Sequence, residues 1–110
     1  MVNEWLAQID LGAACLLFLT GLPLAAGKVR RNRWYGFRLP KTLASDEAWY
    51  GVNRYGGRLM VLWSALPLVA APIVGTLPAE SPFTYPVGVG AIVVASIVPS
   101  VAGVLRSTRY

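Results

Sequence analysis

The chain has 110 residues, of which 55% are hydrophobic and 14% are charged, whereas a soluble domain carries about 25% charged residues. Eight of the ten Lys and Arg residues lie between Lys28 and Arg58. Three long stretches carry no charge at all, residues 11–27, 59–79 and 81–105. This pattern excludes an ordinary soluble domain and predicts an all-α integral membrane protein, with a single membrane domain over residues 1–110.

The first predicted transmembrane helix covers residues 5–27. A helix of this length extends about 34 Å, which is enough to cross the hydrocarbon core of a bilayer. Asp10 falls in its first turns, near one interface, where a charge costs less than at the centre of the membrane. A cleaved signal peptide would begin with a basic region. Because this N-terminus carries Glu4 and Asp10 instead, we expect the segment to remain as a span.

Three further segments follow in the chain: an ordered loop over residues 28–45, a second helix over residues 46–76 and a third span over residues 83–105. Ser45 is a suitable N-cap, and Asp46 next to it matches the positive end of a helix dipole. The second helix is therefore predicted to begin near Asp46 and to run continuously through the cytoplasmic interface into its span. Prolines inside the last two spans are tolerated in a helix bundle as kinks.

The distribution of basic residues predicts the orientation of the chain. Cytoplasmic loops of membrane proteins carry an excess of Lys and Arg. The loop and the start of the second helix hold eight basic residues, and the C-terminal tail adds Arg106 and Arg109. With three spans, the loop and the tail lie on the same side of the membrane. We therefore expect the N-terminus outside, and the loop and the C-terminus in the cytoplasm.

Proline gives the loop a local structure of its own. Pro40 keeps the preceding residue out of helical geometry, so residues 35–41 are predicted to be extended or turned. Arg38 lies inside this stretch. Its guanidinium is expected to pair with Asp46, with Glu47 or with a lipid phosphate.

Polar and aromatic side chains are predicted to hold the loop in place. Asn32, Thr42 and Asn53 are expected to hydrogen-bond the irregular loop backbone, which needs partners close to a membrane. Trp49 and Asn53 lie one turn apart on the second helix. This face is expected to pack against residues 32–42, which would give an ordered cap on the cytoplasmic end of the second helix.

The same positions resemble the SdpI immunity-protein family of small bacterial membrane proteins. The residues that carry the resemblance are Asn32, Tyr35, Gly36, Arg38, Pro40, Thr42, Trp49 and Asn53. Gly21 and Pro23 near the end of the first helix also fit the family pattern, so the resemblance covers the first two helices and the loop, about half of the chain. We consider these eight residues candidates for binding a partner or for structuring the loop.

The resemblance implies a location and a role. It implies a multi-pass protein of the bacterial cytoplasmic membrane. It also implies immunity, because the namesake of the family protects its producer from a secreted membrane-active peptide. That protein signals the presence of the toxin by holding a transcriptional repressor at the membrane.

Four basic residues that follow the first span are predicted to face lipid: Lys28, Arg30, Arg31 and Arg33. Charge at this place fixes topology and contacts anionic head groups. A nucleic-acid partner is not expected, since the patch lies against the membrane. We also expect no enzymatic activity, no metal and no cofactor. The chain has no histidine, and the neighbouring Asp46 and Glu47 point about 100° apart on a helix, so they do not converge as an acid–base pair.

Three hypotheses for function remain open. The first is an immunity or receptor-like protein that binds a membrane-active peptide or a protein partner. The second is an accessory subunit of a larger membrane complex, because small residues on the helices suit docking onto other helices. The third and least favoured is a transporter that forms only as an oligomer. A homo-oligomer is compatible with all three hypotheses.

Overall fold

The computed structural model describes residues 2–78 and 80–110, and every regular element within these ranges is a helix. Three helical rods are long and apolar enough to cross a membrane: Asn3–Ala25, Asp46–Thr76 and Thr84–Ser107. The predicted all-α architecture with three membrane-spanning segments is therefore confirmed. The molecule is elongated and measures 51 × 22 × 19 Å.

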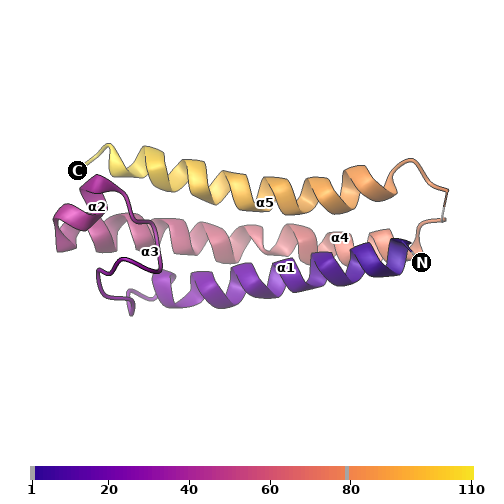
Figure 1. The fold of residues 1–110 in the computed structure, drawn as a ribbon, viewed down its shortest axis with the longest axis horizontal. Helices are drawn as coiled ribbons and strands as arrows, with labels where there is room; N and C mark the ends of the chain where they lie inside the picture. Colours follow the sequence, from indigo (N-terminus) through magenta and orange to yellow (C-terminus); the bar gives the residue numbers. More distant parts are fainter. Residues whose placement is uncertain (1, 79) are drawn as a thin grey trace.

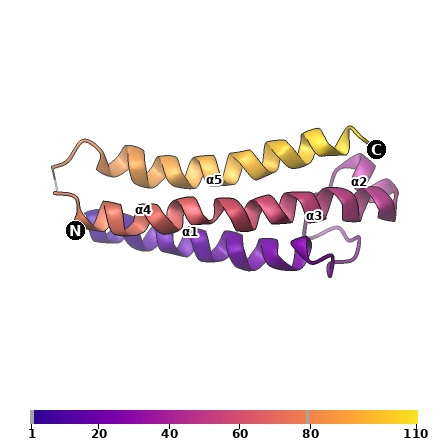
Figure 2. The ribbon, with the colours of Figure 1, turned by 180° about the vertical axis from the view of Figure 1, so that it is seen from behind.

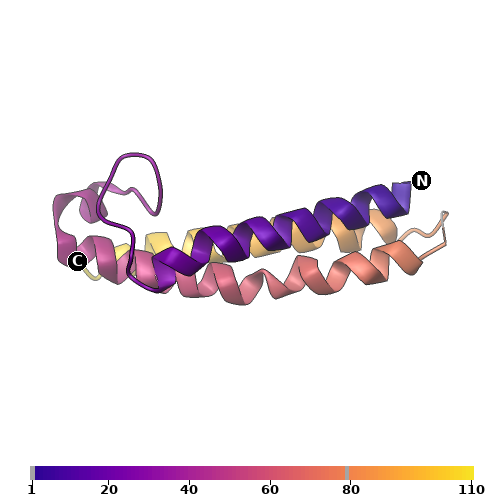
Figure 3. The ribbon, with the colours of Figure 1, turned by 90° about the horizontal axis from the view of Figure 1, so that it is seen from below.

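The elements in chain order are α1 (Val2–Ala25), α2 (Pro40–Ala44), α3 (Asp46–Trp63), α4 (Ala65–Thr76) and α5 (Thr84–Ser107). Figure 1 shows α1, the α3–α4 rod and α5 lying along the long axis. Helices α1 and α5 run in the same direction, and the α3–α4 rod runs against both. Helix α2 and the C-terminus lie at one end, here called the loop end, as the view from behind in Figure 2 and the view from below in Figure 3 also show. The N-terminus and the turn between α4 and α5 lie at the opposite, N-terminal end.

The second rod is interrupted at Ser64, where the sequence predicted a continuous helix. Pro67 has no amide N–H, so the carbonyl of Trp63 lacks its usual helical partner. The Ser64 hydroxyl donates to the carbonyl of Val61 at 2.6 Å. The helical ladder resumes at Leu68, whose N–H donates to the carbonyl of Ser64 at 3.3 Å. The interruption is therefore local, and α3 and α4 together form one span.

Close helix packing depends on small residues. A Cβ on Gly57 of α3 would lie 2.7 Å from the Cβ of Leu24 and 2.8 Å from the carbonyl oxygen of Gly21, both on α1. Small buried residues also line α5, where they are Gly88, Ala91, Ala95 and Gly103. Such residues let helix backbones approach closely within a membrane. The outer faces instead expose large apolar side chains, among them Leu19, Leu62 and Leu105.

The connection between α1 and α3 contains a short helix that the sequence analysis did not predict. Leu39 is extended, with φ −103° and ψ 159°, as expected for a residue before proline. Pro40, however, starts α2, because its fixed φ suits the first position of a helix. Lys41, predicted to be extended or turned, is therefore helical. Ser45 caps α3 as predicted, since its hydroxyl accepts the N–H of Ala48 at 3.1 Å.

Candidate functional site at the loop end

A buried stripe on α3 holds the loop against the bundle. Trp49 is 0% exposed and Asn53 is 2% exposed. The indole Nε1 of Trp49 donates to the carbonyl of Val29 at 2.8 Å. The side-chain Oδ1 of Asn53 accepts the N–H of Phe37 at 2.6 Å, while Nδ2 donates to the Trp49 carbonyl at 2.9 Å. These two side chains therefore fix the start and the far part of the loop to α3.

Two further polar side chains shape the loop from within. The Oδ1 atom of Asn32 accepts the backbone N–H groups of residues 34 and 35, both at 2.8 Å, which is an Asx-type turn. The hydroxyl of Thr42 is fully buried. It accepts the N–H of Leu39 at 2.7 Å and donates to the carbonyl of Phe37 at 2.6 Å. The loop backbone thus receives side-chain partners on both sides of the Tyr35–Gly36 turn.

Gly36 occupies a position that no other residue type fits. Its φ is 108°, a conformation that L side chains rarely adopt. A Cβ at this position would lie 2.6 Å from the Oδ1 of Asn53 and 3.1 Å from the Cη2 of Trp49. Glycine therefore allows the loop backbone to lie directly on the α3 stripe.

Phe37 joins the loop to two helices, and sequence reasoning missed it. A Cβ added to Gly56 of α3 or to Gly103 of α5 would overlap the Phe37 ring. The ring is therefore held between the two glycines and bridges α3 and α5. The available signal was Gly56 itself, which lies on the same helical face as Asn53 and leaves space there for a large partner.

Tyr35 attaches the loop to the remaining long helix. Its hydroxyl donates to the backbone carbonyl of Thr20 on α1. Burial raises the pKa of the Tyr35 phenol above its ordinary value of 10.0. Together, Tyr35, Phe37 and Asn53 connect one short loop segment to α1, α5 and α3.

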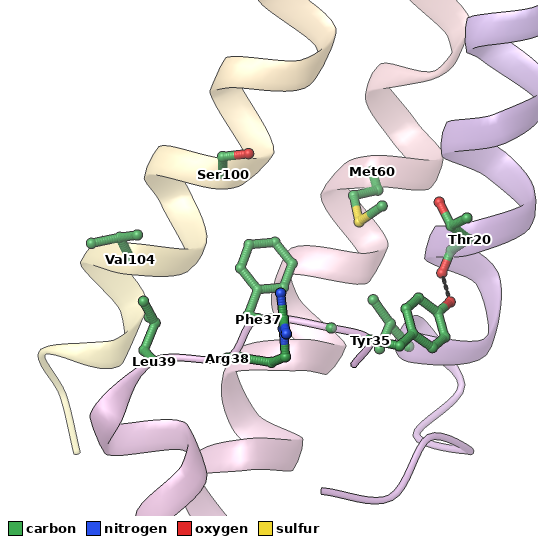
Figure 4. Close-up of a pocket in the computed structure, with 10 residues that line it drawn as sticks. Thr20, Tyr35, Phe37, Arg38, Leu39, Met60, Ser100 and Val104 are labelled. Atoms are coloured by element: carbon green, nitrogen blue, oxygen red, sulfur yellow. Dashed lines mark hydrogen bonds between the residues drawn. The ribbon is translucent and has the colours of Figure 1, made fainter. Parts of the chain in front are cut away.

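A crevice of about 460 Å³ lies beneath residues 35–39. Figure 4 shows its wall residues on three helices, Thr20 on α1, Met60 on α3, and Ser100 and Val104 on α5. Both α5 residues are exposed, so the crevice is open on the α5 side of the bundle. Its walls are mostly apolar, and the polar side chains among them are Thr20, Tyr35, Arg38 and Ser100.

Arg38 does not form the predicted ion pair with Asp46 or Glu47, and its pairing with a lipid phosphate stays a prediction. Asp46 instead pairs with Arg31, whose Nε lies 3.5 Å from Oδ1. Helix α2 intervenes between Arg38 and the start of α3, and the Arg38 guanidinium donates to the carbonyl of Arg33. Arg38 also lines the crevice. It therefore places a positive charge beside the apolar walls, and the described residues supply no carboxylate within ion-pair distance of it.

The surface around the crevice is cationic and aromatic. The four basic residues that follow α1 are exposed at the loop end: Lys28, Arg30, Arg31 and Arg33. Trp34 is 87% exposed beside them. Within the described ranges, no three His, Cys, Asp or Glu side chains gather as a metal site would require. This end of the molecule therefore combines an apolar crevice with a cationic and aromatic surface.

The sequence profile of the SdpI/YfhL protein family matches residues 28–102. The chain belongs to this family. No curated protein and no solved structure matches it. The matched region of this SdpI-family protein contains all eight signature residues, from Asn32 to Asn53. The match also extends through most of α5 and begins only after α1, whereas the residues of the sequence resemblance cover the first two helices and the loop.

Proposed function

We propose that this SdpI-family protein protects a bacterial cell by binding a membrane-active peptide in the crevice beneath residues 35–39. The observation that carries the proposal is the crevice itself, which combines apolar walls with the Arg38 guanidinium. An amphipathic peptide has the complementary chemistry. Its apolar side chains match the walls, and a carboxylate matches the arginine.

The way in which the loop is held supports this proposal. Four side chains hydrogen-bond the loop backbone through well-defined bonds, namely Asn32, Thr42, Trp49 and Asn53. A site that is formed before its ligand arrives has less conformational entropy to lose on binding. The crevice walls also lie on membrane-spanning helices, so a peptide within the bilayer would reach them without leaving the membrane.

The proposal places the loop end on the cytoplasmic side of the bacterial inner membrane. The excess of Lys and Arg at this end supports that orientation. Exposed Arg30 and Arg33 would then face anionic lipid head groups. The same loop segment carries Trp34 on its outer surface, so occupancy of the crevice would be signalled to a cytoplasmic protein through residues 34–39.

The test is survival of a sensitive bacterium that expresses the chain and is exposed to pore-forming or depolarising peptides. Ser100→Trp, which fills the crevice, should abolish protection. Val101→Trp is the matched control, because Val101 neighbours Ser100 on α5 but is exposed outside the crevice. Both variants must reach the membrane in equal amounts.

Two outcomes would overturn the proposal. One is full protection by the Ser100→Trp variant, which would exclude the crevice as the binding site. The other is no protection by the wild-type chain against any such peptide. If, in addition, mild-detergent purification retained a stoichiometric membrane partner, the role of an accessory subunit would replace immunity.

A further inference from the structure

Asp10 is a carboxylate inside the bundle, far from the loop end. Its side chain is 0% exposed, and neither carboxylate oxygen has a hydrogen-bond partner among the described residues. Asp10 faces α5, because a Cβ on Gly88 would lie 3.0 Å from its Oδ2. It lies about 12 Å from the start of α1 along the helix axis. The sequence predicts that this residue lies near one interface, and the structure adds that its side chain points into the bundle.

Among the described residues, no cationic side chain lies near Asp10. Helix α4, which packs against α1, has no titratable side chain, and between Arg58 and Arg106 the sequence has no Lys, Arg or His. Arg58 is the last charged side chain of α3, and its neighbour Gly57 packs against Gly21 of α1, about three helical turns away from Asp10. The other titratable groups at the N-terminal end, Glu4, Glu80 and Tyr85, are exposed. An unpaired carboxylate inside a membrane protein is costly, and no cationic side chain of the described residues offsets that cost.

Two more oxygen atoms lie buried and unpartnered at the same end, the Oδ1 of Asn3 and the Oγ1 of Thr84. Asn3 precedes Asp10 by two helical turns on α1, and Thr84 precedes Gly88 by one turn on α5. Because α1 and α5 run in the same direction (Figure 1), both oxygens lie between Asp10 and the N-terminal end. The Nδ2 of Asn3 donates to the Leu77 carbonyl at 2.5 Å, which holds its amide in place. Water that entered between α1 and α5 from this end would meet these oxygens before it reached Asp10.

The close packing identifies the neutralising species. A metal ion needs several oxygen ligands and room for its own volume. Around Asp10 the Leu6 side chain and the Gly88 backbone fill the space, since a Cβ on Gly88 would lie 2.5 Å from the Cδ2 of Leu6. A proton neutralises a carboxylate without occupying this space. Once ionised, the carboxylate would need water, which enters only if α1 and α5 move apart.

We propose that Asp10 is a proton-binding site that exchanges with the solution at the N-terminal end by way of Asn3 and Thr84. The proton is bound while α1 and α5 are packed together at Gly88, and its loss separates the two helices there. The site gives the bundle a contact that responds to pH. It is independent of the crevice and of peptide binding.

Infrared spectroscopy of the full chain in lipid nanodiscs, with isotope-labelled aspartate, tests the proton. The sequence has only two aspartates, Asp10 and Asp46, and Asp46 is 71% exposed at its side chain. At neutral pH we expect one protonated carboxyl band that Asp10→Asn removes, and one ionised band that Asp46→Asn removes. Two ionised bands at neutral pH would refute the proposal. The wild-type spectrum alone can give that result, so the test remains valid even if a variant fails to fold.

The same samples test exchange and helix movement. The protonated band should shift in heavy water, and Thr84→Val should slow the shift. Spin labels at the exposed positions Ile9 and Val89, in a chain without Cys15, should move apart as the pH is raised. Asp10→Asn should keep them together, while Glu80→Gln should behave as wild type. A band that never exchanges, or labels that separate equally in the Asp10→Asn variant, would overturn the proposal.

Discussion

Replacing Asn53 by Ala should release the loop from α3. The change removes the acceptor of the Phe37 N–H and the donor to the Trp49 carbonyl, which are bound at 2.6 Å and 2.9 Å. A buried N–H without a partner costs about 1–3 kcal/mol. We expect a loss of about 2 kcal/mol, because this N–H is only partly buried. The matched control is Asn32→Ala, whose bonds to the loop are largely exposed. Water can replace them, so the expected loss is below about 1 kcal/mol.

The assay is reversible unfolding in mixed detergent micelles, together with hydrogen exchange at the amide of Phe37. Asn53→Ala should speed exchange at Phe37 about tenfold or more, since a free-energy change of 1.4 kcal/mol corresponds to a factor of about 10. Asn32→Ala should leave it nearly unchanged. If Asn32→Ala destabilised the fold as much as Asn53→Ala does, burial would not determine how much these hydrogen bonds contribute to stability.

Three further predictions concern the same end of the molecule. Gly103→Val should destabilise the fold by about 1–3 kcal/mol through overlap with the Phe37 ring, and Phe37→Ala should relieve part of that loss in a double-mutant unfolding experiment. The folded pKa of Tyr35 lies above its ordinary value of 10.0. The stability that its hydrogen bond to the Thr20 carbonyl contributes is therefore fully present below pH 10.0, the ordinary pKa. It is lost as the pH rises through the folded pKa. An alkaline unfolding titration should show this loss in wild type and not in Tyr35→Phe. Asp46→Asn breaks only an exposed ion pair, so the free energy of unfolding should change by no more than about 1 kcal/mol. A larger change would show that the ion pair contributes more to stability than its exposure predicts.

Local rules predicted the parts of the structure that depend on near neighbours in the chain. The three spans follow from uninterrupted apolar sequence, and the start of α3 follows from the N-cap chemistry of Ser45. Trp49 and Asn53 are one helical turn apart, so their shared face follows from helix geometry. That face is the one that the loop covers.

These local rules could not predict contacts between residues that are far apart in the chain. Phe37 meets Gly103, which is 66 positions later in the sequence, and only the packing of α5 against α3 brings the two together. The ion pair of Asp46 depends on how α2 turns the chain, which is why Arg31 rather than Arg38 is its partner. The inward direction of Asp10 depends on which face of α1 meets α5. Apolar residues surround α1 on all sides, so the sequence gives no signal for that face.

The two ends of the bundle differ in how most of their buried polar side chains are satisfied, and the exception at the loop end is the Nε of Arg106, which has no hydrogen-bond partner among the described residues. At the loop end, the buried side chains of Thr42, Trp49 and Asn53 all have partners, and a satisfied polar network rigidifies its surroundings. At the N-terminal end, Asp10 and Thr84 keep buried oxygens without partners. Unsatisfied groups of this kind call for a ligand or for movement. A preformed crevice therefore belongs at the loop end, and a proton-dependent change in packing belongs at the other.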